Sequence, residues 1–565
     1  MTIDSQAEQH GSTGLATLNI VLKPVGDGRS PDRIDVTIRF SSLTTRAGEP
    51  ALALPIRIAS VPGCDIAADA LSADDARGPL VVSAIDDATD PTGFGHSRRY
   101  AFDRATDGEV RLRYTARATS ADAPRRSGPP FDLIWQDGGI SGVGATFLIL
   151  PPDDAPWRAR LEWDLSALPA GATSVSSLGD GAIGFDGPPD RVKYCFYMAG
   201  ELAHAGSQSG GNDGLEAHWL GTPHFDAASV MDWLADVYTR LAAILPRAGT
   251  QPFRVMGRLG SLPVCGGAAM PDSFMIGYGR APQSESSVKF LLAHELAHPL
   301  AGSMKSEVNE CAWYAEGLAE FYKLMVPLRA GLVTADEFLQ ELAESTRGYY
   351  MNPKISLANA DIDAQFWSDS QVRKLPYQRG LLYFLELDWR LRRASDGALT
   401  LETLVNRMND NHRAGHASDL AFWRELIDTS LGEPGLRAID DLLTGARLVP
   451  PPEILGDGFE RRALPMQQYV LGFSEKSFGV ARVEGLLPDS AASNAGVRNG
   501  DAIVSHDYSN RDRELQPAPI TLCIERNGQQ QVITFVPRGE TVEGFEWFKA
   551  GDAVRMSAVT GGESA

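Results

Sequence analysis

The residues best suited to chemistry lie in the segment LLAHELAHPLA, residues 291–301. His294, Glu295 and His298 form the pattern His-Glu-x-x-His. If this segment is helical, residues four apart lie on one face, so both imidazoles can bind one metal ion. The carboxylate of Glu295 then stands beside the metal, where it can take a proton from a water molecule. The pattern therefore predicts a hydrolytic zinc site.

The alternative for this pattern is a solvent-exposed helix that carries two histidines by coincidence. Two neighbouring features favour the metal site. The apolar run 291–293 precedes His294 and indicates a partly buried helix, in which bare histidines would need partners. Pro299 has no backbone N–H and Gly302 follows it, so we expect the helix to bend or end just after the second histidine.

A catalytic zinc ion requires three protein ligands and one open position. Glu316, in the segment WYAEGLAEFY (residues 313–322), follows His298 by 18 positions, which leaves room for a turn and a second helix. Glu316 is therefore the candidate third ligand, and an ordinary exposed helix carboxylate is the alternative. Glu320 lies one turn further along the same face and is a candidate acceptor for the free N–H of a ligating imidazole.

Composition limits what the rest of the chain can be. The 565 residues allow about three to five domains, and 43% hydrophobic with 22% charged residues is ordinary for a globular protein. The net charge of −21 argues against nucleic acid or an anionic membrane as the main partner. No apolar run approaches the roughly 20 residues of a membrane span. The five cysteines are widely spaced and show neither a disulfide framework nor a Cys-x-x-Cys metal pair.

Three regions differ in their hydrophobic periodicity, and we expect a multidomain α+β protein. Residues 14–170 carry short alternating segments that predict an antiparallel β domain. Residues 171–455 are mainly helical with some strand at the front, and residues 461–545 return to short strands. The predicted strands of the first region are TLNIVLKP, RIDVTIRF, LALPIRIASV, RRYAFD, EVRLRYTARA and FLILPP.

The segments HELAH and WYAEGLAEFY resemble the gluzincin, or thermolysin-clan, zinc metallopeptidases, and within them the glycyl aminopeptidase family. Residues 375–408, LPYQRGLLYFLELDWRLRRASDGALTLETLVNRM, are similar to that family's segment of tyrosine, glycine and a long helix. The resemblance covers residues 160–540 and, more weakly, the preceding sheet. It implies an N-terminal β domain, a thermolysin-like catalytic domain and a C-terminal PDZ domain with a β-sandwich or barrel fold.

The resemblance implies zinc-dependent hydrolysis of peptide bonds, with one Zn²⁺ per chain and Glu295 as general base. It also implies that Tyr377 donates a hydrogen bond to the developing oxyanion. From spacing alone, Tyr377 is only an aromatic residue at the start of a predicted helix, and core packing is the alternative. The expected substrates are peptides or proteins with a small N-terminal residue such as Gly or Ala.

One segment departs from the family pattern. In the family, a Gly-Gly-Leu-Glu-His segment lines the substrate cleft, and its glutamate binds the free α-amino group. Residues 265–274 here read CGGAAMPDSF: Gly266 and Gly267 remain as candidate substrate-binding residues, but Ala-Met replaces the Glu-His pair. Because a buried ammonium without a carboxylate is costly, either Asp272 substitutes for the glutamate or a free N-terminus is not required. The second case describes an endopeptidase or other specialised peptidase.

Residues 480–507 closely resemble the signature of a PDZ domain. Such domains bind an extended peptide by adding a strand to a sheet edge, often holding its terminal carboxylate in a backbone nest. Within YVLGF, residues 469–473, the candidate carboxylate loop is Leu471, Gly472 and Phe473, and a plain buried strand is the alternative. A third hypothesis for the whole protein is therefore a peptide-binding protein with a silent metal site.

The remaining histidines and the first residues give weaker indications. His412 and His416 are four apart, but their segment contains glycine and is predicted to be a solvated loop. His204 and His218 have no spacing that predicts a shared role. The opening MTIDSQAEQHGSTG lacks the features of a secretion signal, so the expectation is a cytoplasmic protein, or an exported or periplasmic one if a leader has been removed.

Overall fold

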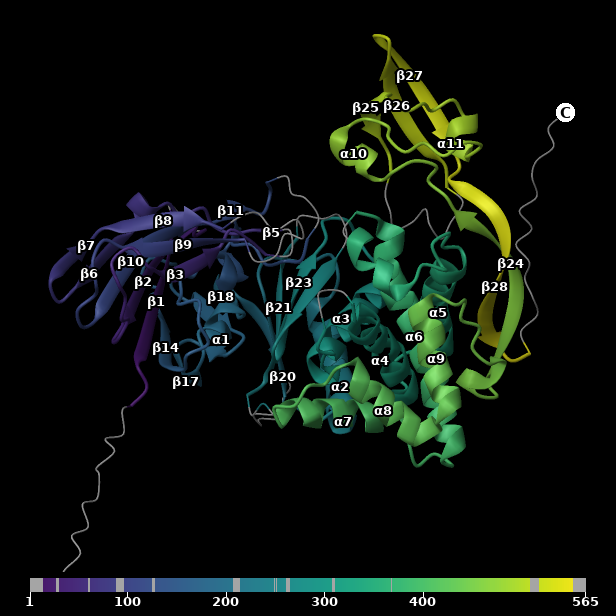
Figure 1. Ribbon diagram of the computed structural model, residues 1–565, viewed down its shortest axis with the longest axis horizontal. Helices are drawn as coiled ribbons and strands as arrows, with labels where there is room; N and C mark the ends of the chain where they lie inside the picture. Colours follow the sequence, from purple (N-terminus) through teal and green to yellow (C-terminus); the bar gives the residue numbers. More distant parts are fainter. Residues whose placement is uncertain are drawn as a thin grey trace, which may run out of the picture. The chain divides into compact units, whose positions relative to one another are not determined.

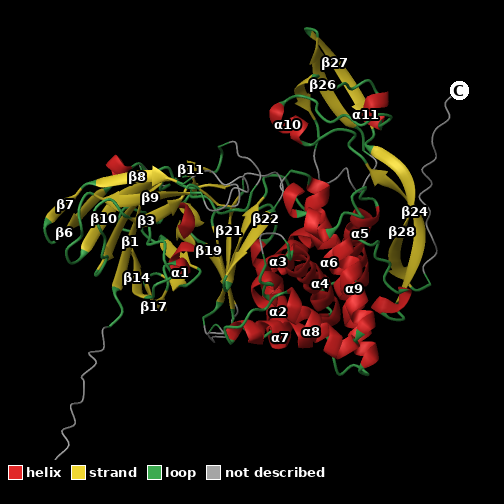
Figure 2. Cartoon of the chain, in the orientation of Figure 1, coloured by secondary structure: helices red, strands yellow, loops and turns green. Residues whose placement is uncertain are grey.

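The computed structural model shows a multidomain α+β protein with several sheets and a helical region (Figures 1 and 2). Two compact units can be distinguished: residues 1–239 with 248–299, and residues 240–247 with 300–565. In the described part of the chain, no helix is long and apolar enough to cross a membrane. The structure describes residues 14–26, 30–58, 61–87, 96–123, 128–206, 214–247, 249, 251–260, 265–306, 310–366, 368–508 and 518–551. The opening segment MTIDSQAEQHGSTG, from which the location was predicted, lies outside the described residues except for Gly14.

The first unit begins with a seven-stranded sheet of order β17-β14-β1-β2-β10-β6-β7. Strand β1 pairs with β2 antiparallel and with β14 parallel. Buried and partly exposed residues alternate along β1 and β2, which confirms the predicted strand periodicity. The bounds are β1 Thr17–Val25, β2 Arg33–Phe40, β6 Ser72–Asp75, β7 Gly78–Leu80, β10 Val110–Arg117, β14 Trp157–Trp163 and β17 Ile183–Gly187.

A six-stranded sheet of order β11-β12-β13-β18-β15-β16 and a three-stranded sheet of order β3-β9-β8 follow. These sheets use strands as late as β18, so the β region continues past the predicted boundary at residue 170. The bounds are β3 Pro50–Pro55, β8 Val82–Asp86, β9 Ser97–Phe102, β11 Thr119–Ser120, β12 Ile134–Gln136, β13 Gly139–Val143, β15 Thr173–Ser176, β16 Gly179–Asp180 and β18 Phe196–Gly200.

The predicted strand FLILPP, residues 147–152, is buried up to residue 151 but is not a strand. Its backbone forms only a single bridge, between Leu150 and Ala53. The N–H of Ile149 instead donates to the hydroxyl of Tyr114 over 3.0 Å. The prediction was wrong because a continuous apolar run indicates burial, and it says nothing about whether a neighbouring strand pairs with it.

The last sheet of the first unit has five strands in the order β19-β20-β21-β23-β22. Strands β20, β21 and β23 are parallel, whereas β22 is an antiparallel edge strand paired with β23. Helix α3 contains the segment 291–301 that the sequence indicated to be helical, and the strands lie at the front of the region 171–455, as expected. The bounds are β19 Ala203–Gly206, β20 Leu215–Trp219, β21 Phe253–Leu259, β22 Gly266–Met270, β23 Ser273–Tyr278, α2 Ala227–Ile244 and α3 Glu285–Ala301.

Helices make up most of the second unit, as predicted for the region up to residue 455. Helix α6 begins at Ser370 rather than at Tyr377, because the side chain of Asp369 accepts hydrogen bonds from the N–H groups of Gln371 and Val372. The bounds are α4 Ala312–Ala330, α5 Ala335–Tyr350, α6 Ser370–Ala394, α7 Leu401–Arg413, α8 Leu420–Leu431 and α9 Glu433–Thr444.

Helices α4 and α6 are in direct backbone contact at two glycines. A Cβ atom on Gly380 would lie 2.6 Å from the Cα of Gly317, a separation that real side chains do not tolerate. The rings of Trp313 and Phe384 stack beside this crossing, with centroids 5.9 Å apart. The crossing therefore fixes the neighbouring turns of both helices. On α4 this includes Glu316, which directly precedes Gly317, and on α6 it includes the turn before Gly380.

The C-terminal region of the second unit contains short strands, as predicted. Strands β24 and β28 form an antiparallel pair, and β25, β26 and β27 form a three-stranded sheet with its own apolar core. Leu471, Gly472 and Phe473 follow β24 and are not part of a strand, and Gly472 has φ +90°; their role as a carboxylate loop stays a prediction. The bounds are β24 Phe459–Tyr469, α10 Lys476–Val480, α11 Ala491–Asn494, β25 Ala502–His506, β26 Ile520–Arg526, β27 Gln529–Phe535 and β28 Arg538–Lys549.

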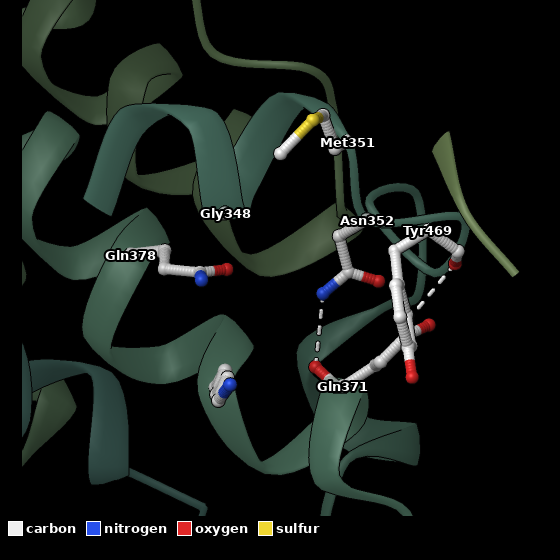
Figure 3. Close-up of a pocket in the computed structure, with 7 residues that line it drawn as sticks. Gly348, Met351, Asn352, Gln371, Gln378 and Tyr469 are labelled. Atoms are coloured by element: carbon white, nitrogen blue, oxygen red, sulfur yellow. Dashed lines mark hydrogen bonds between the residues drawn. The ribbon is translucent and has the colours of Figure 1, made fainter. Parts of the chain in front are cut away.

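Side chains at the start of α6 bond to this C-terminal region. The amide of Gln371 donates to the carbonyl of Tyr469 over 3.0 Å, and Asn352 donates to the carbonyl of Gln371 over 2.9 Å (Figure 3). The backbone N–H and hydroxyl of Ser370 both donate to Glu475. A cavity of about 10 Å³ beside them has room for about one water molecule. The first turns of α6 are therefore held from outside the helical bundle.

Replacing Gly380 with alanine should destabilise the protein by about 1–3 kcal/mol, because the added methyl group overpacks the contact with Gly317. The matched control is Gly479→Ala in helix α10, where a Cβ atom meets nothing within 4 Å. Chemical denaturation of both variants checks this expectation. Equal stability of the two variants would show that the helices can separate at this crossing without cost.

Candidate active site

Helix α3 presents His294 and His298 on one face, as the spacing predicts. Their Nε2 atoms lie 3.1 Å apart and their rings are nearly perpendicular, at 86°. Two nitrogens that share one tetrahedral zinc ion at about 2.0–2.1 Å lie about 3.3 Å apart. His294 is only 7% exposed, whereas His298 is partly exposed. The two donors therefore fit a shared metal ion at the margin of the buried part of the helix.

The helix ends directly after the second histidine, as predicted. Pro299 lies inside α3, where it cannot donate to the carbonyl of Glu295, and the helix stops at Ala301. Gly302 follows with φ +73°. The amide of Asn409 then donates to the carbonyl of Leu300 over 3.0 Å and satisfies one of the last carbonyl groups of the helix.

Glu295 lies directly against the edge strand β22. A Cβ atom on Gly267 would lie 2.5 Å from the Cγ and 2.6 Å from the Oε1 of Glu295, so only glycine allows this approach. A Cβ atom on Gly266 would meet nothing within 4 Å. Within the described sheet, β22 pairs with β23 alone, which leaves its other edge available for an extended peptide. The carboxylate of Glu295 therefore stands next to a strand edge that a peptide can join.

Asp272 lies in the tight turn that joins β22 to β23. Met270 pairs with Ser273 across this turn, and Asp272 adopts φ +53°. At about 3.3 Å per residue, the turn is on the order of 10 Å along the strand from Gly267. This position does not favour Asp272 as a group beside the reacting carbonyl, and its role in binding an α-amino group stays a prediction.

Glu316 is partly buried on α4, in the position immediately before the crossing glycine Gly317. One ligand atom each of His294, His298 and Glu316 lies within 4.8 Å of the others. Two imidazoles and a carboxylate are a donor set that zinc accepts, and they leave a fourth position open. The residues present therefore fit a catalytic zinc ion.

Glu320 belongs to a buried charged group that the sequence did not reveal. Its Oε2 lies 2.9 Å from the ammonium of Lys323 and accepts a 3.1 Å hydrogen bond from Ser345. Lys323 also contacts Glu341 at 2.8 Å. Burial alone would lower the pKa of Lys323, but the two carboxylates outweigh it and raise that pKa. The i,i+3 spacing of Glu320 and Lys323 in one helix could have indicated this ion pair from the sequence. The expected hydrogen bond from an imidazole N–H to Glu320 stays a prediction.

Tyr377 lies inside α6, one turn before Gly380, and is partly exposed. Other tyrosines of this unit, such as Tyr314 and Tyr322, are almost completely buried in the helical core. This difference weakens the core-packing alternative for Tyr377. The Gly317–Gly380 crossing holds Glu316 and Tyr377 on neighbouring turns of two helices in direct contact.

Residues 288–374 match the model of the M61 glycyl aminopeptidase family. The matched range contains both histidines, Glu295, Glu316 and Glu320, and ends just before Tyr377. The match confirms the resemblance to this family over that segment and supports peptidase chemistry. A search of curated proteins found no match to the chain.

The fold is similar to that of an aminopeptidase N family protein from Idiomarina loihiensis, with a TM-score of 0.67 and 13% identity over 94% of this chain and 98% of the other. An M1 zinc metallopeptidase from Deinococcus radiodurans gives a TM-score of 0.43 at 15% identity, over 77% of this chain and 95% of the other. Leukotriene A4 hydrolase from Saccharomyces cerevisiae gives a TM-score of 0.44 at 12% identity, over 78% of this chain and 68% of the other. The first similarity shows a shared fold.

Replacing Gly267 with alanine should reduce peptide hydrolysis about 100-fold, because the new methyl group displaces the carboxylate of Glu295 by about 1 Å. Gly479→Ala, where an added Cβ atom meets nothing within 4 Å and which lies outside the site, is the control and should stay within about twofold of wild type. The measurement is kcat/KM on an alanyl peptide, with zinc content determined alongside. Equal effects of the two substitutions would contradict the inferred contact between β22 and the carboxylate.

Proposed function

We propose that this protein is a zinc-dependent peptidase, and specifically an aminopeptidase that favours small N-terminal residues such as Gly or Ala. The observation that carries the proposal is the pair of imidazole nitrogens 3.1 Å apart on α3, with Glu295 between them in sequence and against a free strand edge. The match of residues 288–374 to the glycyl aminopeptidase family supports the same chemistry. One Zn²⁺ per chain would be held by His294, His298 and Glu316.

A bound zinc ion would supply Lewis-acid polarisation of the scissile carbonyl and lower the pKa of a water molecule toward about 7. Glu295 takes the proton from the attacking water and returns it to the leaving amine. The hydroxyl of Tyr377 donates a hydrogen bond to the carbonyl oxygen as that oxygen gains negative charge. The free edge of β22 binds the peptide backbone in an extended form, with Gly266 and Gly267 beside the reacting bond.

The choice between exo- and endopeptidase depends on what binds the substrate's N-terminus. Strand β22 has the sequence GGAAM and offers no carboxylate to an α-ammonium group. An aminopeptidase therefore needs an acidic group from outside β22 to bind the α-ammonium group of the substrate. Asp272, in the turn after β22, is the predicted candidate. The alternative is an endopeptidase or specialised peptidase that accepts blocked N-termini.

The C-terminal loop of Leu471, Gly472 and Phe473 stays a predicted site for a peptide carboxylate. The carbonyl of Gly472 accepts a hydrogen bond from the N–H of Leu487 over 2.7 Å, which fixes the loop against the segment before α11. A PDZ-type role for this region would bring a second peptide to the protein. It would leave the hydrolytic chemistry unchanged.

Replacing Glu295 with glutamine should lower kcat by about 10²–10⁴-fold while the zinc content stays unchanged, because the amide cannot accept the proton of water. His298→Ala should instead lose one equivalent of zinc together with activity. Glu285→Gln in the exposed first turn of the same helix is the control. Zinc analysis and steady-state kinetics check these outcomes. A chain that binds no zinc at this position, or full activity after chelation, would favour the silent-site hypothesis.

An aminopeptidase should cleave an alanyl peptide at least about 100-fold faster than its N-acetyl counterpart, since acetylation removes the buried charge pair at the N-terminus. The measurement is kcat/KM for the two peptides with the same purified enzyme. Equal rates would reject the aminopeptidase assignment and support the endopeptidase alternative. The zinc chemistry of the preceding test is independent of this result.

A further inference from the structure

A second group of metal-ligating side chains lies in the first unit, in residues that the hydrolytic mechanism does not use. One ligand atom each of Asp180, Glu216 and His218 lies within 4.8 Å of the others. Asp180 ends the short strand β16, whereas Glu216 and His218 are on β20. Two carboxylates and an imidazole thus meet at a point where two different sheets of the same unit approach each other.

The strand register adds another imidazole to this group. Strands β19 and β20 are antiparallel, and His204 is the direct partner of His218. Their ring centroids are 5.9 Å apart. Because the Cβ atoms of such a pair are about 4.5–5.5 Å apart, both rings can turn toward one ion. The set then consists of two imidazoles and two carboxylates, which suits zinc and similar divalent ions.

Arg254 holds both carboxylates in place. Its Nη2 lies 3.2 Å from Oε2 of Glu216 and 3.5 Å from Oδ1 of Asp180, and the residue is only 4% exposed. One guanidinium neutralises one of the two carboxylate charges, so the group keeps a net charge of −1. Each carboxylate has about four acceptor positions and can bond to Arg254 and to a metal ion at once.

The ring of His218 offers a buried nitrogen to this group. Its Nε2 is buried, and no described residue accepts or donates a hydrogen bond there. A buried polar atom without a partner is costly, and a metal ion would satisfy it.

The group opens into a cavity that can admit an ion and its water molecules. The cavity has a volume of about 510 Å³, and Asp180, His204 and His218 contribute to its wall. Ser174 and Thr173 from the neighbouring strand β15 line another part of it. Asp180 and His204 are exposed, so a hydrated ion can reach the ligands from solvent without rearrangement of the sheets.

We propose that Asp180, His204, Glu216 and His218 form a second site for a divalent transition-metal ion, with zinc as the expected occupant. The site would join the edge strand β19 to β16 of the neighbouring sheet, so its ion would act as a structural clip within the first unit. It shares no ligand with the group of His294, His298 and Glu316.

Zinc stoichiometry tests this proposal. The metal-free full-length chain, titrated with zinc chloride and followed by calorimetry and elemental analysis, should bind two equivalents. His218→Ala should bind one and retain peptidase activity, whereas the His294→Ala/His298→Ala double variant should bind one and be inactive. Combining the three substitutions should abolish binding. If His218→Ala binds as much zinc as wild type, or if the double variant binds none, the proposal is wrong.

Two further sets of variants guard against indirect effects. His412→Ala changes an exposed histidine at the end of α7 and should leave two equivalents. Because His218 is mostly buried, its replacement can impair folding, which circular dichroism would detect. In that case Asp180→Asn and His204→Ala, both at exposed positions, carry the test. Each should weaken zinc binding of the double variant at least about tenfold, and unchanged binding in both would reject the site.

Discussion

The structure depends most on the close approach of polar groups that can be buried only if something binds them. Two imidazole nitrogens lie 3.1 Å apart, one of them on a residue that is 7% exposed, and the carboxylate beside them is 8% exposed. Burying such polar groups is costly unless they are bound, and a shared metal ion would bind both nitrogens at once. Gly267 lets strand β22 approach the carboxylate of Glu295, and the Gly317–Gly380 contact lets helices α4 and α6 cross with their backbones touching.

Buried charged groups are also paired with one another one turn further along α4. Glu320 and Lys323 are both nearly buried, and neither would be stable there alone. The ammonium of Lys323 lies between Glu320 and Glu341 and links α4, which carries Glu316, to α5. The net charge of −21, by contrast, has no counterpart in a single structural feature.

Local patterns in the sequence predicted the parts of the fold that depend on local physics. The buried helix around His294 was indicated by the apolar run before it, and its end was indicated by Pro299 and Gly302. The alternation in β1 and β2 predicted strands for the same reason. The apolar run 147–152 was misassigned because pairing depends on a neighbour that the run itself does not specify. Likewise, the earlier start of α6 depends on a cap at Asp369.

The two groups of metal-ligating residues show where such prediction stops. His294 and His298 are brought together by one turn of helix, so four residues of sequence contain all the information needed. His204 and His218 are brought together by the register of β19 on β20, and Asp180 reaches His218 from another sheet. No spacing in the chain encodes that register, since it depends on how whole strands pair. A search by motif therefore finds sites built on one helix and overlooks sites of the same chemistry built across strands.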